Sequence, residues 1–347
     1  MSNSSKEYLK RKDVTAVYDG TRKKGGKDTG QPCAVVGVKK KKPLSELTSE
    51  EVLPSDVDVR EINITLQQHR SRHRPVMGGV SGIIEGQTAC TIGAIVVDNK
   101  TDKLVLLTNN HCVGILYNTE YDTPSVGFDK VEGFSFLQPS PYDGGNPNND
   151  VIGKVIRAYP LNFGDDVPMN YVDAAIVSID QLNDSWFSII ELDDGPFEFA
   201  DDSDITNSTI VTKSGRTTGV TTGEIFATNM SVNVGMSSDS NDIVTFDRQI
   251  AIFGSGVSAG GDSGSVIAIE KNGKYYIAGL LFAGGTMDGH DVAICNYISE
   301  VVKYLNIRPW NGDIVLPHNA PETITINNVT FEEVSQTEYN LTHYVKT

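Results

Sequence analysis

Short apolar runs alternate with glycine, asparagine and aspartate from Met77 onward, and this pattern predicts an all-β fold. Each run has the length and β-branched content of a strand. The runs form two series, which predicts two β-units. The first series comprises Thr91–Val97, Leu104–Leu107, Val151–Ala158 and Ala174–Ile179. The second comprises Thr209–Lys213, Thr222–Ala227, Ile243–Ile252, Ser265–Ile269, Tyr275–Phe282 and Val292–Asn296.

Helical periodicity is clearest at Asn296–Ile307. Apolar residues there recur at i, i+3, i+4 and i+7, and the stripe ends before Pro309. We predict a C-terminal helix that docks on a β-unit. The extension at residues 309–347 contains further alternating segments at Thr323–Val329, which predict a β-rich tail used for packing or assembly.

The N-terminal quarter has a different composition. Residues 1–30 are polar and rich in glycine and lysine, which predicts a flexible basic N-terminus. Residues 31–75 contain strand-like segments at Pro32–Val38 and Val57–Ile64, and we interpret them as a small appendage. The two β-units then occupy residues 76–200 and 201–308.

Charge limits the classes of partner. The net charge is −16, but residues 1–42 hold twelve basic and four acidic residues, so the other 305 residues carry −24. An acidic body repels phosphate backbones and anionic membranes, so we expect neither nucleic acid nor a membrane as a partner of anything except the basic N-terminus. No apolar run approaches the 18 residues of a membrane span, and the first twelve residues lack the apolar segment of a secretory signal peptide. We expect a cytoplasmic protein.

The four cysteines, Cys33, Cys90, Cys112 and Cys295, show none of the CxxC spacings typical of zinc sites. Two interpretations of Cys90 and Cys112 stay open, a disulfide or a pair of buried thiols in a reducing compartment. The segment Lys213–Gly223 lacks the Gly-Lys-Ser/Thr ending that a P-loop needs. We therefore expect no metal and no cofactor.

The strongest chemical signal is the loop Ala259–Ser265, of sequence AGGDSGS, followed by an apolar strand. Glycines before a serine let the backbone turn its N–H groups toward one point, where they can stabilise an oxyanion. Gly261 and Ser263 would be those donors, and Asp262 would anchor the loop. The alternative interpretation is an ordinary Gly/Asp/Ser turn between strands.

A serine hydroxyl needs a base, and the base needs an orienting group. His111 ends the run Leu104–Leu107 through a polar turn, and Asp173 lies at the edge of the apolar strand Ala174–Ile179. A lone histidine is usually structural. A buried carboxylate is costly without a hydrogen-bonded partner, so Asp173 calls for an explanation.

Together these segments resemble the trypsin-like serine peptidases of the chymotrypsin fold, in which His, Asp and Ser occur in this order. The resemblance implies two packed six-stranded antiparallel barrels, with His111 and Asp173 on the first and Ser263 on the second. It also implies the roles: His111 as general base, Asp173 as its orienting carboxylate and Ser263 as nucleophile. Cys90 resembles the start of the family's strand before the histidine turn, where a Cys90–Cys112 bridge would fall.

A closer resemblance, over most of residues 32–305, is to a subgroup of intracellular trypsin-like peptidases that includes microbial members and the plant narrow-leaf-type proteins. It implies a protein or peptide substrate and a homo-oligomer. The motifs that carry it are Pro43–Leu47, His73–Pro75 with Gly78–Ser81, Leu107–His111, Pro141–Gly145 and Lys213–Gly223.

The chain departs from the larger family at the substrate pocket. Phe282 replaces the serine usually found beneath the triad aspartate, so support for Asp173 must come from elsewhere. Val257 stands where trypsin-type enzymes carry the acid that selects Lys or Arg, which predicts a small or apolar pocket. The pocket residues implied are Val257, Ser258, Phe282, Ala283 and Gly284. A substrate strand would pair with the backbone at Phe282–Gly284.

The sequence shows no activation site that would free an N-terminal Ile or Val to bind Asp262. We therefore expect an internal partner for Asp262, and without one the oxyanion loop would form only after an activator or substrate binds.

These observations lead to a serine endopeptidase that forms an acyl-enzyme at Ser263. The first alternative is a catalytically weak or inactive scaffold that binds peptides and assembles. The second is an esterase or other acyl transferase, because the triad chemistry does not distinguish amides from esters.

Overall fold

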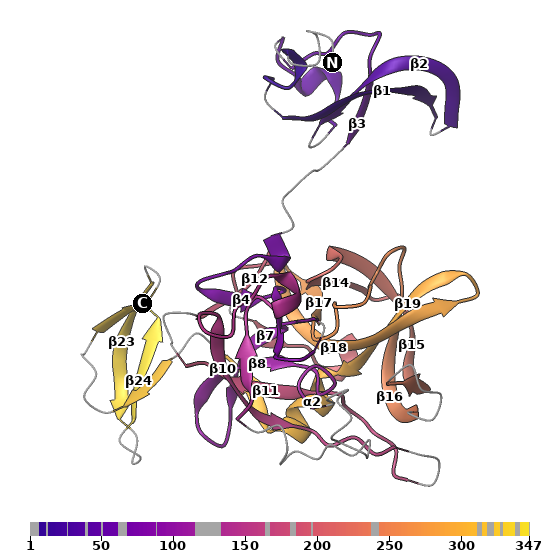
Figure 1. The fold of residues 1–347 in the computed structure, drawn as a ribbon. Coiled ribbons are helices and arrows are strands. Elements are labelled where there is room, and N and C mark those ends of the chain that lie inside the picture. Colours follow the sequence, from indigo (N-terminus) through magenta and orange to yellow (C-terminus); the bar gives the residue numbers. More distant parts are fainter. Residues whose placement is uncertain are drawn as a thin grey trace. The chain divides into compact units, whose positions relative to one another are not determined.

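The computed structural model describes residues 7–11, 13–25, 27–38, 41–49, 51–61, 68–87, 89–114, 133–163, 167–180, 185–195, 197–236, 243–310, 314–317, 323–326, 329–336 and 341–346. The chain divides into two compact units, Met1–Gln68 and His69–Thr347 (Figure 1). The first ends seven residues before the boundary expected at residue 75.

The first unit is a small sheet of order β1-β2-β3, with β1 at Val14–Lys24, β2 at Lys27–Val38 and β3 at Asp58–Glu61. β1 and β2 form an antiparallel hairpin, and β3 runs parallel to β2. Residues 14–30 are thus ordered as strands, which differs from the flexible N-terminus predicted for residues 1–30. The reason is long-range pairing, because Val17 and Tyr18 lie opposite Val36 and Val35, which are buried. The predicted strand Val57–Ile64 is partly found as β3, and its residues 62–64 lie outside the described residues.

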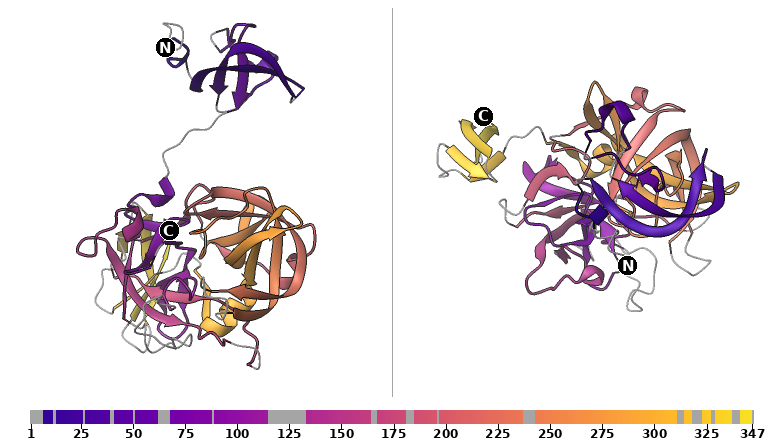
Figure 2. Two further views of the ribbon diagram at one scale, coloured as in Figure 1. Left: turned by 45° about the vertical axis from the view of Figure 1, so that its right-hand side comes forward. Right: turned by 90° about the horizontal axis from the view of Figure 1, so that it is seen from above.

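The second unit contains the two barrels, whose curled sheets lie side by side in both views of Figure 2. The first sheet has the order β20-β7-β8-β11-β10-β9-β5-β6. The short strands β4 and β12 pair parallel beside it. The bounds are β4 Val76–Gly78, β5 Ser81–Ile84, β6 Cys90–Thr91, β7 Ala94–Asp98, β8 Lys103–Thr108, β9 Ser135–Leu137, β10 Val151–Ala158, β11 Ala175–Ser178 and β12 Ser185–Ile189.

Strands β7, β8 and β11 contain uninterrupted apolar stretches, Ala94–Val97, Val105–Leu107 and Ala175–Val177, because both of their faces are buried there. In β7, Ile95 and Val97 point into the core of the first barrel, whereas Ala94 and Val96 pack in a second cluster. That second cluster also contains Val266 and Leu280 of the other barrel. Successive side chains of a strand alternate between faces, so an uninterrupted apolar run fits a strand that lies between two cores.

The second sheet has the order β13-β18-β17-β14-β15-β16-β19, and the extra pairing of β18 with β19 closes it into a barrel. The predicted all-β architecture of two packed barrels is confirmed, and the first of them is a curled sheet with edge strands. The bounds are β13 Glu198–Phe199, β14 Ile210–Gly215, β15 Gly219–Gly235, β16 Ile243–Phe253, β17 Val266–Lys271, β18 Lys274–Met287 and β19 His290–Tyr297.

The predicted C-terminal helix is present as α2 but is shorter, at Ile298–Leu305. It starts later because Asn296 and Tyr297 still belong to β19, and it ends at Asn306, which adopts a left-handed backbone (φ 51°). Val301 and Leu305 are buried against the interface between the barrels. β20 (Ile307–Pro309) then pairs with β7, so the chain returns to the first barrel.

The C-terminal extension forms a sheet of order β21-β24-β23-β22, which confirms a β-rich tail. Its strands are β21 Ile314–Pro317, β22 Thr323–Ile326, β23 Val329–Gln336 and β24 Leu341–Lys346. Among the described residues, no helix is long and apolar enough to cross a membrane.

Candidate active site

His111 and Asp173 meet where two neighbouring strands of the first barrel begin and end. β8 pairs antiparallel with β11, and Thr108 lies opposite Ala175. The turn that follows β8 therefore lies beside the segment that precedes β11. The Nδ1 atom of His111 is 2.6 Å from Oδ2 of Asp173, and the backbone N–H of His111 donates to Oδ1 at 3.0 Å. Both carboxylate oxygens are thus engaged by one histidine, which fixes the orientation of its ring.

Two asparagines hold the main chain of Asp173, which is completely buried. The Asn109 side-chain amide donates to the Asp173 carbonyl at 2.7 Å, and the Asp173 N–H donates to the Asn296 side-chain oxygen at 3.0 Å. Asn296 belongs to the second barrel. Because Phe282 replaces the usual serine, we expect other residues to support Asp173, and Asn109 and Asn296 do so. Sequence reasoning did not single them out, although Asn109 lies in the motif Leu107–His111.

The Ser263 loop packs its backbone directly against the first barrel. A Cβ atom at Gly264, which has φ +95°, would lie 2.1 Å from the carbonyl oxygen of Thr91. The Ser263 carbonyl accepts from the Thr91 N–H at 2.8 Å. Glycine is therefore required after the serine, both for its backbone conformation and for this close approach. The contact brings Ser263 next to Cys90–Thr91, beside the histidine turn.

The backbone N–H groups of Gly261 and Ser263 donate no hydrogen bond to any acceptor in the described part of the chain. Their neighbours do, because Asp262 donates to Ala259 at 3.0 Å and Gly264 donates to Leu281 at 2.9 Å. Buried or partly buried backbone donors are rarely left without a partner. Two unused N–H groups beside a serine hydroxyl can donate hydrogen bonds to a developing oxyanion.

The Ser263 hydroxyl donates to the carbonyl of Phe282 at 3.4 Å. Between His111 and Ser263, both within the described residues, the structure shows no hydrogen bond. It therefore brings the histidine and the aspartate together and leaves the serine hydroxyl turned to another acceptor. A hydroxyl changes partner by rotation about the Cα–Cβ bond between staggered rotamers.

Asp262 has the internal partner that the sequence leads us to expect. Its carboxylate accepts from the N–H groups of Thr217 (2.7 Å), Thr218 (3.1 Å) and Ala259 (2.9 Å) and from the Thr218 hydroxyl (2.7 Å). The Lys213 ammonium lies 3.6 Å from Oδ2, and both side chains are almost inaccessible to solvent. Burial lowers the pKa of Lys213, an effect that the Asp262 charge opposes. The loop is thus ordered by the hairpin between β14 and β15.

The five predicted pocket residues differ in exposure. Val257 and Phe282 are buried in the cores of the second barrel, where Phe282 packs against Phe246 with ring centroids 4.5 Å apart. Ser258 and Ala283 are half-buried and Gly284 is exposed. A Cβ at Gly284 would lie 2.7 Å from the Ser258 hydroxyl, so these two residues face each other closely.

One edge of β18 is open beside the serine. β17 pairs with β18 only as far as Leu280, whereas β19 follows β18 to Met287 on its other side. Among the described residues, no strand pairs with Phe282–Gly284 on the edge away from β19, where the Phe282 carbonyl accepts only the Ser263 hydroxyl. An extended peptide can add to such an edge by main-chain hydrogen bonding.

Cys90 and Cys112 form a disulfide, with Sγ atoms 2.03 Å apart, which settles the alternative left open above in favour of the bridge. Cys90, His111 and Cys112 also form the one cluster of three potential metal ligands among the described residues, with ligand atoms within 4.8 Å of one another. Because the sulfurs are bonded to each other, they are not thiolate ligands in this state.

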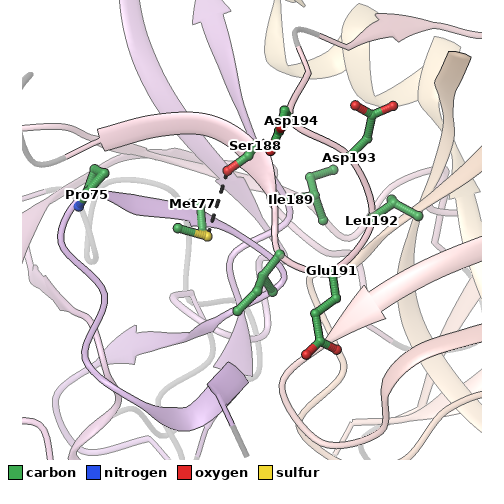
Figure 3. Close-up of a pocket in the computed structure, with 9 residues that line it drawn as sticks. Pro75, Met77, Ser188, Ile189, Glu191, Leu192, Asp193 and Asp194 are labelled. Carbon is green, nitrogen blue, oxygen red and sulfur yellow. Dashed lines mark hydrogen bonds between the residues drawn. The ribbon is translucent and has the colours of Figure 1, made fainter. Parts of the chain in front are cut away.

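A groove of about 670 Å³, lined by none of these residues, lies between Pro75 and Met77 on one side and Ser188–Asp194 on the other (Figure 3). Its charged side chains are the carboxylates of Glu191, Asp193 and Asp194. It contains no nucleophile paired with a base, so its volume does not make it the chemical site.

Comparisons with known proteins return serine proteases at low identity. No protein-family model matches the chain, and no curated protein does. A glutamic acid-specific serine protease aligns with 68% of this chain and 100% of its own at 18% identity and a TM-score of 0.46. Cellulomonas bogoriensis chymotrypsin (68% and 98%, 19% identity, TM-score 0.42) and Thermobifida fusca protease A (67% and 97%, 18%, 0.43) align similarly. Similarity at this level does not assign an activity.

Proposed function

We propose that the protein is a serine endopeptidase that hydrolyses peptide bonds through an acyl-enzyme at Ser263. The observation that supports it most is the pairing of His111 with a fully buried carboxylate beside a glycine-rich serine loop with two unused N–H donors. An ordinary turn between strands requires neither the buried His111–Asp173 pair nor the two unused N–H donors. Together they supply a base, its orienting group and an oxyanion site.

In the proposed reaction, rotation of the Ser263 hydroxyl from Phe282 to the His111 imidazole precedes attack. The imidazole takes the hydroxyl proton as oxygen bonds to the substrate carbonyl carbon, and the Gly261 and Ser263 N–H groups stabilise the oxyanion. His111 then returns the proton to the leaving amine. Asp173 keeps the imidazole in the tautomer that can accept at Nε2. Water repeats the sequence to release the acid.

Labelling of Ser263 by a fluorophosphonate tests this proposal. We expect mass spectrometry to find one adduct on Ser263 in the wild type and none in S263A or H111A. Cleavage products from a denatured peptide library should show small or apolar P1 residues, because Ser258 and Gly284 nearly touch. Absence of both adduct and cleavage in the folded wild type would reject the enzyme.

The second candidate is an inactive scaffold that binds extended peptides at the open edge of β18. The contact between the Ser263 hydroxyl and the Phe282 carbonyl favours it, since that hydroxyl is not activated as it stands. Peptide binding measured by fluorescence anisotropy without any fluorophosphonate adduct would support the scaffold. Homo-oligomerisation stays a prediction, which light scattering of the full chain would check.

A further inference from the structure

A buried ion pair joins the two barrels under the serine loop. Asp143 ends the 3₁₀ turn Pro141–Asp143 of the first barrel, and Arg216 lies in the turn between β14 and β15 of the second. Arg216 Nε donates to Oδ2 at 2.8 Å and Nη2 donates to Oδ1 at 2.5 Å. The side chains are 6% and 5% exposed. This two-bond geometry fixes the guanidinium in position and in plane.

Other groups hold the carboxylate of Asp143 in place and in its charged form. The hydroxyls of Ser81 and Ser140 donate to Oδ2 at 2.6 and 3.1 Å. Burial alone would raise the pKa of Asp143, but the bonds from Arg216 and Ser81 outweigh it and lower that pKa. The first barrel therefore presents a fixed anion to Arg216.

From Arg216 a chain of contacts leads to the oxyanion site. Arg216 Nη1 donates to the Thr217 hydroxyl at 3.0 Å, and that hydroxyl donates to the Gly260 carbonyl at 2.8 Å. The Gly260 carbonyl and the Gly261 N–H belong to one planar trans peptide, so they point in opposite directions. Holding the carbonyl on Thr217 turns the Gly261 N–H away from it, which prevents a flip of this peptide.

The guanidinium also supports the loop by direct packing. A Cβ at Gly261 would lie 2.9 Å from Arg216 Nη1 and 3.2 Å from its Cδ. The Thr91 hydroxyl accepts from the Arg216 N–H at 3.0 Å and donates to the Gly261 carbonyl at 2.9 Å. Gly261 is thus contacted by both the Arg216 side chain and the Thr91 hydroxyl.

We propose that Asp143 and Arg216 are positioning residues that hold the Gly260–Gly261 peptide with its N–H available to the oxyanion. Docking of the two barrels and formation of the oxyanion site are then one event. This inference rests on the proposed peptidase function. The peptide flip that the pair prevents removes one oxyanion donor, a change that costs enzymes about 10²–10³ in kcat.

The test compares D143N and T217V with D98N. The control alters the Asp98–Arg157 pair, which is equally buried and has a bond of 2.7 Å, but which contacts the end of α2 through the Leu305 carbonyl. We expect kcat per titrated active site to fall about 10²-fold in D143N and T217V, with KM nearly unchanged. R216K keeps the positive charge but loses the two-bond guanidinium geometry, so it should retain only part of the wild-type kcat. D98N should lower the melting temperature and leave kcat unchanged.

Hydrogen exchange of residues 259–263 gives a readout that needs no activity. We expect faster exchange there in D143N and T217V than in the wild type or D98N. Wild-type kcat and exchange in D143N and T217V, or equal losses in D98N, would overturn the inference. If the peptidase proposal itself fails, the wild type will give no Ser263 adduct. The exchange data would then still decide whether the Asp143–Arg216 pair orders the loop.

Discussion

Replacing Lys213 with methionine should disorder the serine loop through its contact with Asp262. Methionine keeps most of the aliphatic stem, so the change removes the ammonium and little packing volume. Lys213 Nζ lies 3.6 Å from Asp262 and donates to the Thr218 hydroxyl at 2.6 Å and the Gly219 carbonyl at 3.2 Å. The variant leaves a fully buried carboxylate without its counter-charge.

The size of the effect follows from the separation of the charges. Two unit charges 3.6 Å apart attract by about 5 kcal/mol at an effective dielectric constant near 20. Removing one partner of a buried pair costs about 3–5 kcal/mol. Four hydrogen bonds to the Asp262 carboxylate remain, so we expect about 3 kcal/mol of lost unfolding free energy. If that loss falls on the loop alone, acylation slows by about 10²-fold.

The assay is the rate of fluorophosphonate labelling per folded molecule, with unfolding followed by chemical denaturation. K271M is the matched control, because Lys271 pairs with Asp204 at 2.6 Å on the surface, and we expect it to label at the wild-type rate. The double variant K213M/D262N should regain stability, since no buried charge is left alone, without regaining activity. Labelling of K213M at the wild-type rate would refute the assignment of Lys213 as the partner of Asp262.

Three further predictions concern Asp173, the disulfide and the buried histidine His69, whose Nε2 lies 3.0 Å from the Ser214 hydroxyl. D173N should lower kcat/KM about 10⁴-fold by presenting the wrong His111 tautomer, and a loss below tenfold would contradict it. The double variant C90A/C112A opens a loop of 22 residues and should lower the unfolding free energy by about 3 kcal/mol, so an unchanged urea midpoint would count against the bridge. Burial lowers the pKa of His69 below its ordinary 6.5. Because the folded pKa is depressed, the unfolded chain binds the proton first, and stability should fall as pH drops below 6.5 through the folded pKa. H69Q should flatten this dependence in unfolding measured from pH 7 to 5.

Local patterns predicted the strands that lie between two cores, because burial on both faces leaves an apolar run with clear ends. The run Ala174–Ile179 became β11 at Ala175–Ser178, one residue shorter at each end. β18 was predicted to end at Phe282 but runs to Met287. The extension, residues 283–287, contains two adjacent glycines and no strand-like alternation, and it is held by pairing with β19, which a local pattern does not contain.

The candidate site divides in the same way. His111, Asp173 and Ser263 lie in motifs whose residue order carries the information, so the sequence predicted them together. Asn296 could not be found this way, since a polar residue at a strand end has many ordinary uses. Its role comes from contact with Asp173, 123 positions away in the chain. Such contacts are created by barrel docking, and no local pattern encodes them.

Docking of the barrels explains why so many buried polar groups are tolerated at their junction. An isolated buried charge is costly, and each carboxylate here is satisfied only when distant segments meet. Asp143 needs Arg216 from the other barrel, and the main chain of Asp173 needs Asn296 from it. If the barrels docked wrongly, these groups would be buried without hydrogen-bond partners. The polar contacts therefore penalise wrong arrangements more than they stabilise the right one, and the arrangement they select is the one that places the serine loop beside the histidine turn.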